Sequence, residues 1–324
     1  TAVDERKLMS MPTIGHVGRY ALKHQMGSGG LGAVYAALDP LLSRPIAVKM
    51  LRVAELGAAQ RESLEQQLLA EARAAAGLNH QHIVTVYDAG LAEEGVYIAM
   101  ERLQGRDLRQ LLADGWRPDP VQAARIAKRL ADALAYAHGH GVVHCDIKPA
   151  NVFMTGRTQP KLLDFGIARV TAGRYDAAAS PLDISAETST VPPPELGSPY
   201  YVSPEHLRGE PLDARADVYG VGVVLYELIT GRRAFDGDSL ESIRHAVLEA
   251  PVAPAHTVNP KVDAALSGIA ARAMARNPGD RYRSARQLSR ALRTWISDET
   301  NGLGHKPRGS HAGYLWAAGG TAGA

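Results

Sequence analysis

The sequence predicts an α+β fold in which a small strand-rich region precedes a larger helical region. Short strand-like runs follow one another from Val17 to about Asp107, and helical patterns dominate from there to about Ser297. Because strands and helices are segregated along the chain and do not alternate, an α+β arrangement is favoured. The length of 324 residues is enough for two lobes with separate cores.

The strand-rich region holds five runs, interrupted by one helical pattern. The runs are Arg19–Gln25, Ala33–Leu38, Pro45–Leu51, Ile83–Ala89 and Gly95–Glu101. The helical pattern covers about Ala58 to Gly77, with Leu64, Leu68 and Ala72 at helical spacing. We therefore expect an antiparallel sheet with one main helix.

The helical region begins with an apolar face over residues 120–138, and Asp119 and Pro120 before it form a helix start signal. Further helical patterns cover about 214–230, 239–249, 261–276 and 284–297. The hinge between the regions is expected near Leu103–Gly105. The expected folded domain is 17–297, with lobes at 17–102 and 103–297, between a flexible lead-in (1–16) and a Gly/Ala-rich linker or tail (298–324).

The bulk composition excludes several classes of protein. The formal net charge is +2 and the basic residues are dispersed, so no strong electrostatic field indicates binding to nucleic acid or an anionic membrane. A single cysteine excludes an internal disulfide framework and is typical of a reducing compartment. The sequence has no uninterrupted apolar run of membrane-spanning length and no signal-peptide layout. We expect a cytoplasmic chain with no nucleic-acid partner and no membrane span.

A glycine-rich stretch, Met26 to Val34, contains the pattern G-x-G-x-x-G. Glycines let backbone N–H groups approach phosphate oxygens closely. The residues after it favour a strand, whereas a dinucleotide-binding turn needs a helix there. A hairpin with a glycine-rich tip over phosphates therefore fits better, and a plain glycine hairpin is the alternative.

Lys49 lies within an apolar strand-like run. It is either an edge lysine that reaches solvent or a cation aimed at phosphates. The second interpretation needs a carboxylate to hold the ammonium group. Glu71, on an otherwise apolar helical stretch, could supply it.

The segment His138–Asn151 concentrates three histidines and the only cysteine, Cys145. A zinc site needs converging ligands, but the side chains of the adjacent His144 and Cys145 tend to diverge. The interpretation favoured here is that His138 and His140 end a helix and His144 is a packed structural residue.

The same segment contains H-x-D-x-K-x-x-N, with Asp146, Lys148 and Asn151, and Asp164 follows thirteen residues later in Asp-Phe-Gly. Two acids, a lysine and an amide form a set for phosphoryl transfer. One carboxylate would orient a hydroxyl, the other acid and the amide would bind Mg²⁺, and the lysine would neutralise the moving phosphate.

With these motifs together, the chain resembles the bacterial "eukaryotic-like" (Hanks-type) protein Ser/Thr kinases over about Val17 to Ser297. The resemblance rests on motifs in matching order and spacing: Gly27/Gly29/Gly32/Val34, Lys49, Glu71, His144 to Asn151, Asp164-Phe165-Gly166, Ser203-Pro204-Glu205, Asp217 and Arg281. It implies a bilobal protein-kinase fold, with a small antiparallel β-rich N-lobe carrying one main helix and a larger α-helical C-lobe.

The resemblance also implies roles for individual residues. The ATP site would comprise Met26, Gly27, Ser28, Gly29, Gly32, Val34, Ala47, Lys49, Met100, Glu101, Leu103 and Phe153, with Met100 as gatekeeper and Glu101 to Leu103 as hinge. The catalytic set would be Asp146, Lys148, Lys49 and Glu71, with Lys49 paired to Glu71. Asn151 and Asp164 would hold Mg²⁺, with Mn²⁺ as the alternative ion. Structural support would come from Asp217 beneath the catalytic loop, an Arg281–Glu205 pair, and His144 and Phe165 in a stacked spine.

The sequence departs from the family where Cys145 replaces the usual arginine before the catalytic acid. That arginine clamps a phosphorylated activation loop. Our hypothesis is that loop phosphorylation matters less here or acts through another cation; redox control through Cys145 is a weaker alternative.

The resemblance implies protein substrates, a homodimer for autophosphorylation, and a membrane tether beyond Ala324 in some relatives. The long activation segment offers candidate phosphorylation sites at Thr171, Ser180, Ser185, Thr188, Ser189, Thr190 and Ser198. Ser198 is expected to contact Asp146 and Lys148. A pseudokinase scaffold that binds nucleotide and a small-molecule kinase of similar fold are the two alternatives.

Overall fold

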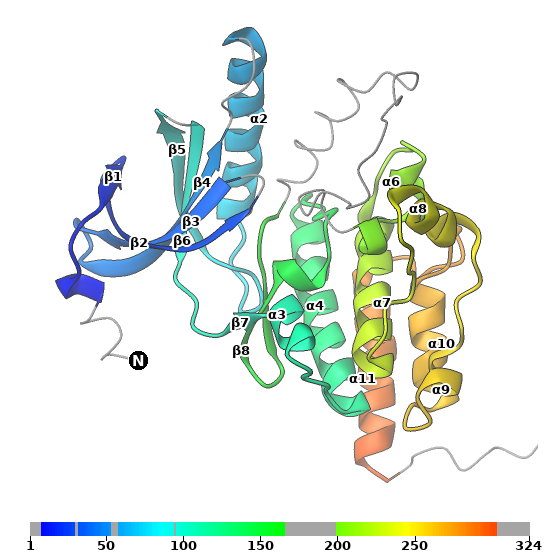
Figure 1. The fold of residues 1–324 in the computed structure, drawn as a ribbon. Helices are drawn as coiled ribbons and strands as arrows, with labels where there is room; N and C mark the ends of the chain where they lie inside the picture. The colour runs from blue at the N-terminus through cyan, green and yellow to red at the C-terminus, as the bar shows by residue number, and fades with distance from the viewer. Residues whose placement is uncertain (1–7, 30–31, 53–57, 94, 166–198, 303–324) are drawn as a thin grey trace, which may run out of the picture.

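The computed structural model describes residues 8–29, 32–52, 58–93, 95–165 and 199–302, and all structural statements below concern these residues. Figure 1 shows a twisted antiparallel sheet with the long helix α2 (Ala58–Ala76) at its side, followed by a larger helical lobe. The predicted α+β architecture of a small β-rich lobe and a larger α-helical lobe is confirmed.

The N-terminal sheet has the order β1-β2-β3-β4-β6-β5, with antiparallel neighbours throughout. Its strands are β1 (Gly15–Val17), β2 (Tyr20–Gly29), β3 (Gly32–Asp39), β4 (Arg44–Arg52), β5 (Val86–Ala92) and β6 (Gly95–Glu101). The expected strand at Gly95–Glu101 matches β6. The run expected at Ile83–Ala89 begins as a strand only at Val86, because Ile83 forms an isolated bridge with Leu162 instead.

Strand register brings several expected site residues to one face of the sheet. Lys49 lies opposite Val34 on one side and Ile98 on the other, and Ala47 lies opposite Met100. Because side chains alternate along a strand, Ala47 and Lys49 share a face. The helix α2 covers that face through its buried Leu64, Leu68 and Ala72, the residues whose spacing predicted it.

The expected flexible lead-in is structured from Leu8 onwards. The Leu8 side chain is 2% exposed, and β1 pairs with β2. The Lys23 ammonium group donates hydrogen bonds to the Met11 carbonyl at 2.9 Å and to the Thr13 hydroxyl at 3.1 Å. Residues 1–7 and 303–324, the latter forming most of the expected tail, lie outside the described part.

The helical lobe contains α3 (Leu108–Ala113), α4 (Pro120–Gly139), α6 (Pro204–Leu207), α7 (Ala214–Thr230), α8 (Leu240–Glu249), α9 (Ala255–Val258), α10 (Ala264–Ala273) and α11 (Ala285–Thr300). The start signal of α4 is confirmed, since Asp119 and Gln122 form a reciprocal capping box. The expected helix at 261–276 is shorter as α10, because the Asp263 side chain accepts from the Leu266 N–H and caps the helix there.

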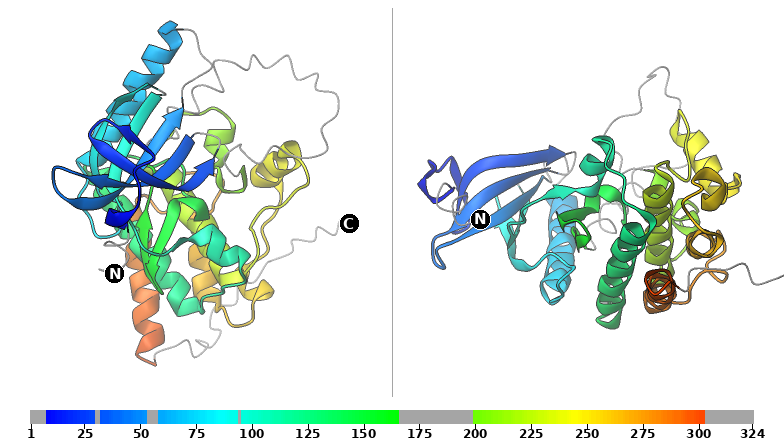
Figure 2. Two further views of the ribbon diagram at one scale, coloured as in Figure 1. Left: turned by 60° about the vertical axis from the view of Figure 1, so that its left-hand side comes forward. Right: turned by 90° about the horizontal axis from the view of Figure 1, so that it is seen from below.

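The core of this lobe surrounds α7, whose residues are buried on nearly every side. Figure 2 shows α7 among α4, α10 and α11. Gly220 allows the chain to approach closely, since a Cβ atom there would lie 2.7 Å from the Ile147 Cβ. In this way α7 supports the segment that carries the expected catalytic residues.

A second, three-stranded sheet was not predicted. It consists of β7 (Arg106–Asp107), β8 (Val152–Gly156) and β9 (Gln159–Leu162). These strands are too short to show a period-2 pattern above chance. The short 3-10 helix η1 (Pro149–Asn151) leads directly into β8, and η2 (Pro199–Tyr201) precedes α6.

Candidate active site

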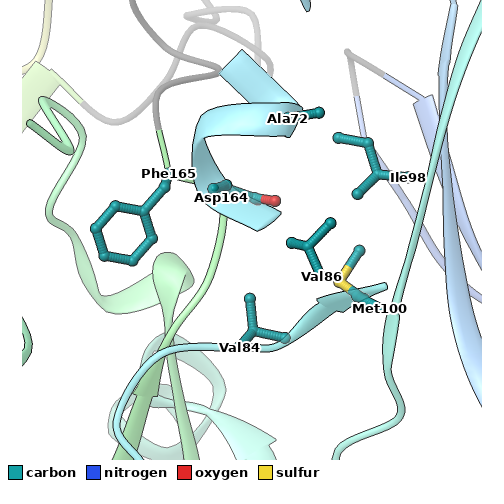
Figure 3. A pocket seen from close by; sticks show the side chains of 8 residues that line it. Ala72, Val84, Val86, Ile98, Met100, Asp164 and Phe165 are labelled. Atoms are coloured by element: carbon teal, nitrogen blue, oxygen red, sulfur yellow. The ribbon is translucent and has the colours of Figure 1, made fainter. Parts of the chain in front are cut away.

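A small apolar pocket lies between α2, the adjacent sheet face and the segment Asp164–Phe165. It is lined by Ala72, Ala75, Val84, Val86, Ile98, Met100, Asp164 and Phe165. In Figure 3 the Asp164 carboxyl group points toward the cluster of Val86, Ile98 and Met100, whereas the Phe165 ring points the other way. The pocket therefore joins the expected gatekeeper to the expected metal-binding acid.

Lys49 reaches across from β4 to the C-terminal lobe. Its Nζ lies 2.8 Å from Asp164 Oδ2, and the side chains are 15% and 25% exposed respectively. Burial alone would raise the pKa of the Asp164 carboxyl group, but the Lys49 charge outweighs it, and the pKa lies below its ordinary value. Asp164 is therefore an anion at neutral pH, as a metal ligand must be.

The expected pair of Lys49 with Glu71 stays a prediction. Glu71 is half-buried in α2 and directly precedes Ala72, which lines the pocket. Lys49 forms an ion pair with Asp164 in this structure.

The loop between α4 and β8 brings three of the predicted residues together. Asp146 Oδ2 lies 2.6 Å from Lys148 Nζ and accepts a hydrogen bond from Asn151 Nδ2 at 2.8 Å. The Asn151 amide group also donates to the Asp146 backbone carbonyl at 2.8 Å. A carboxylate, an ammonium group and an amide are thus fixed within one hydrogen-bond network.

The donor atoms fit a hard divalent cation. Both side-chain hydrogen bonds of Asn151 within the described residues use its amide nitrogen, so these contacts leave its amide oxygen for a metal. Among the described residues, no three His, Cys, Asp or Glu side chains converge on a common metal position. Mg²⁺ does not need such a cage, since it is commonly held by one or two carboxylates together with substrate phosphates and water. Asn151 and Asp164 suit that arrangement.

Asp217, the fourth residue of α7, anchors the catalytic loop from below. Its side chain is fully buried and accepts the His144 N–H at 2.9 Å and the Cys145 N–H at 2.7 Å. The contact expected between Asp217 and the loop is confirmed. Cys145 has a φ of 63°, in the left-handed region that is costly for a side chain. The two bonds to Asp217 hold this strained residue in place.

His138 adds a third bond to Asp217, through its Nε2 at 2.7 Å. The sequence suggested only a helix-end residue, and nothing in its spacing to Asp217, which lies 79 residues later, could have indicated the contact. His138 therefore belongs to the support of the loop.

His144 is fully buried and joins the loop to the segment around Asp164. Its Nδ1 accepts the Asp146 N–H at 3.3 Å, so its Nε2 carries the proton donated to the Leu163 carbonyl at 2.7 Å. The imidazole ring packs against Phe165 at 4.6 Å between centroids. The predicted structural role of His144 is confirmed, and so is its contact with Phe165.

Glu205 and Arg281 form the pair expected between α6 and the segment after α10. Arg281 donates two hydrogen bonds to the Glu205 carboxylate, both at 2.6 Å, and is itself fully buried. Burial tends to raise the pKa of Glu205, but the guanidinium group outweighs it and the pKa lies below its ordinary value. The remaining Arg281 donors reach backbone carbonyls of Ala275, Arg215 and Arg276.

The glycine-rich stretch forms the β2–β3 hairpin, as predicted. Gly32 has a φ of 145°, and a Cβ atom there would lie 1.7 Å from the Met50 carbonyl oxygen, so only glycine fits. Met26, Gly27 and Ser28 lie exposed on β2, and Gly29 ends that strand. Residues 30–31 lie outside the described part.

The residues expected around adenine fall into two places. Ala47 and Met100 are buried in the cluster beneath α2, and Val34 and Leu103 pack against it. Phe153 comes from β8 in the helical lobe, beside Gly105, where a Cβ atom would lie 3.1 Å from its ring. The site thus spans the two lobes.

The hinge contains a contact that the sequence did not indicate. Glu101 Oε1 lies 2.5 Å from Lys161 Nζ of β9 and accepts the Thr85 N–H at 2.7 Å. The Glu101 side chain thereby fastens the end of the N-terminal sheet to the second sheet. The partners are 60 and 16 residues away, separations at which no local pattern predicts contact.

Fold and site together define the class of the protein: a two-lobed phosphotransferase with a glycine-rich hairpin, a half-buried lysine and two acids at the junction of the lobes. The protein kinase domain family model matches residues 20–291. The chain therefore belongs to the protein kinase family, whose members are ATP-dependent transferases.

Curated relatives agree with this class. The chain is 37% identical over 282 residues to the probable serine/threonine-protein kinase PknB of Corynebacterium glutamicum, covering 85% of this chain and 42% of the relative. It is 39% identical over 276 residues to PknB of Mycobacterium leprae, covering 83% and 42%. It is 34% identical over 277 residues to PrkC of Bacillus subtilis, covering 86% and 40%. The chain thus spans about two fifths of the length of these bacterial relatives.

Within the described part of the chain, no helix combines the length and apolar character needed to cross a membrane.

Proposed function

We propose that this chain is an active protein serine/threonine kinase domain that transfers the γ-phosphoryl group of ATP to Ser or Thr side chains of proteins, including its own activation segment. The observation that carries the proposal is the network in which Asp146 Oδ2 meets both Lys148 and Asn151. Relatives named serine/threonine-protein kinases support the substrate class.

Asp146 is the residue proposed to orient the substrate hydroxyl group and accept its proton. Lys148 and Asn151 both bind Oδ2, so among the described side chains these contacts leave Oδ1 for the hydroxyl group. The Lys148 ammonium group lies 2.6 Å from the carboxylate and would balance charge as the phosphoryl group moves.

Lys49 and Asp164 are proposed to act on the nucleotide side. Asp164 and the Asn151 amide oxygen would hold Mg²⁺, or Mn²⁺, which supplies charge neutralisation at the phosphates when bound. Lys49 would exchange its contact with Asp164 for the α- and β-phosphates, steadied by Glu71. The glycine-rich hairpin would cover the phosphates, and the remaining predicted ATP-site residues would enclose adenine.

The partners and location are proposed from the same role. A homodimer would let one domain phosphorylate the activation segment of another. A cytoplasmic location would give the domain access to ATP. Net charge of +2 offers no support for a nucleic-acid partner.

The test is an autophosphorylation assay. The purified chain is incubated with Mg²⁺ and γ-labelled ATP beside Asp146→Asn, and phosphate is mapped by mass spectrometry. We expect label within residues 171–198, which lie outside the described part, and none in the variant. Bound ATP without label on the chain or on a generic protein would favour the pseudokinase scaffold, and transfer to a small metabolite alone would favour the small-molecule kinase.

A further inference from the structure

A groove on the helical lobe is separate from the candidate active site. It has a volume of about 330 Å³ and is lined by Gly105, Arg106, Leu111, Trp116, Met154, Thr155, Gly156 and Arg157. The lining comes from β7, α3, the turn before α4, and the β8–β9 hairpin. None of these residues takes part in the proposed chemistry.

The walls of the groove are held in place without a partner. The Asp107 side chain caps α3 by accepting a hydrogen bond from the Gln110 backbone N–H at 2.8 Å. The backbone N–H of Trp116 donates to the Leu111 carbonyl at 3.0 Å. On the opposite wall, the Arg129 guanidinium group donates to the hydroxyl group of Thr158 at 2.6 Å and so fixes the hairpin turn. A preformed groove loses less conformational entropy on binding than a flexible one.

The groove has an apolar floor. Met154 is buried at 5% exposure, and Leu111 and Trp116 pack against the core while their side chains stay partly exposed. Gly105 brings the opposite wall close to β8, because a Cβ atom there would lie 2.0 Å from the Met154 carbonyl oxygen. Such a site fits one large aliphatic or aromatic side chain.

The rim of the groove is positive. Two arginines and no acidic residue are among the lining residues. Arg106 is 48% exposed and forms an ion pair with Asp114 at 2.5 Å. Arg157 is exposed and has no ion pair or hydrogen bond in the described part of the chain. A solvent-facing guanidinium group beside an apolar floor complements a carboxylate next to an apolar side chain.

We infer that this groove is a docking site for an extended segment of a partner protein that carries a large apolar residue flanked by Asp or Glu. The inference rests on the proposed function, because docked segments would belong to protein substrates of the kinase. Figure 1 places β7, β8 and α3 on one side of α4, and α6 and α8 on the other side of α7. A segment in the groove would therefore leave the region of Pro199–Leu207 open for the phosphoacceptor.

Docking would act through effective concentration. A substrate tethered in the groove presents its Ser or Thr at a raised local concentration, which lowers KM without changing kcat. We expect KM to fall at least about tenfold when a substrate peptide carries the docking segment at a suitable distance.

The first test is direct binding and does not depend on kinase activity. The probe is a fluorescein-labelled nonapeptide with leucine at its centre and Glu or Asp at the other positions, followed by fluorescence anisotropy. The variant is Arg157→Glu, and Arg293→Glu, an exposed arginine on α11, is the matched control. We expect affinity to fall about tenfold with Arg157→Glu and to stay unchanged with Arg293→Glu.

A charge-reversed probe provides the second arm. A peptide with lysine at the acidic positions should bind Arg157→Glu more tightly than the unmodified chain, a result that a folding defect cannot produce. A glycine in place of the central leucine should abolish binding. No binding of the acidic peptide, equal affinity of the two variants, or binding that survives loss of the leucine would overturn the proposal.

Phosphorylation of a generic protein substrate by the same preparations separates the two proposals. Retained peptide binding with no phosphorylation would support the docking proposal and contradict the proposed kinase activity. Normal phosphorylation with no peptide binding would support the kinase activity and contradict the docking proposal.

Discussion

The three bonds to Asp217 predict the effect of Asp217→Asn on the catalytic loop. The carboxylate accepts the backbone N–H groups of His144 and Cys145 and the Nε2 of His138. An asparagine of the same shape has one acceptor oxygen, and its NH₂ group would face whichever partners the oxygen does not reach. If the asparagine oxygen keeps the hydrogen bond from the Cys145 N–H, the NH₂ group faces His138 and His144. His138 can change tautomer and accept a hydrogen bond from this NH₂ group, but the backbone N–H of His144 is left unpaired.

The cost follows from these contacts. The Cys145 bond changes from charge-assisted to neutral, a loss of about 1 kcal/mol, and the orphaned buried His144 N–H costs about 1–3 kcal/mol. We therefore expect the free energy of unfolding to fall by about 2–4 kcal/mol. Weakening the anchor also lets the strained φ of Cys145 relax, which limits the loss of stability but moves the loop.

Activity should fall further than stability alone explains. Asp146 follows Cys145 directly, so relaxation of the loop moves the proposed catalytic carboxylate, and a shift of about 1 Å can cost about 100-fold in rate. The assay is kcat on a generic protein substrate, with urea unfolding followed by circular dichroism on the same preparation.

Asp263→Asn is the matched control. Asp263 caps α10 and accepts from Trp295, and neither contact involves the loop, so its substitution should lower stability and leave kcat unchanged. Stability and kcat of Asp217→Asn equal to those of the unmodified chain would refute the anchoring argument. Equal losses of kcat in both variants would show that activity follows general stability.

Three further predictions concern the ion pair, pH dependence and Cys145. Arg281→Met removes both hydrogen bonds to the buried Glu205 carboxylate and three carbonyl bonds and leaves that charge unpaired, so urea unfolding should show a loss of about 3–5 kcal/mol, and a loss under about 1 kcal/mol would contradict it. His82 is buried and donates from Nδ1 to the Pro160 carbonyl, and burial lowers its pKa below 6.5 in the folded state. The His82 imidazole therefore binds a proton more tightly in the unfolded chain than in the folded one. The free energy of unfolding that this residue contributes is fully present above about pH 6.5 and is lost as the pH falls, by at most about 1.4 kcal/mol per pH unit. His82→Asn should reduce this slope in denaturation curves between pH 7 and pH 5, whereas an unchanged slope would count against the argument. For Cys145, alanine at every phosphorylated activation-segment residue should leave most kinase activity intact, since a thiol cannot clamp a phosphate; loss of activity that acidic replacements restore would show otherwise.

Local signals predicted most of the elements that position the site. β6 and α7 begin and end where the patterns predict, because β6 is an unbroken apolar run and α7 lies between a capping Asp213 and Gly231. The α10 helix was overestimated at both ends because apolar periodicity continues past the cap at Asp263. The strands β7 to β9 were missed, since strands of two to five residues acquire their partners only from the tertiary fold.

The sequence by itself determined which chemical groups the site contains and in what order they come. A glycine-rich hairpin, a lysine in an apolar strand and a spaced acid–lysine–amide set are short-range features, and their chemistry follows from residue type and spacing. Only the tertiary structure decided how distant groups meet. Lys49 forms an ion pair with Asp164. His138 forms a hydrogen bond with Asp217. The arginine-rimmed groove forms where α3 meets the β8–β9 hairpin. These contacts join segments far apart along the chain, and they arise from the packing of whole elements, which no local pattern encodes.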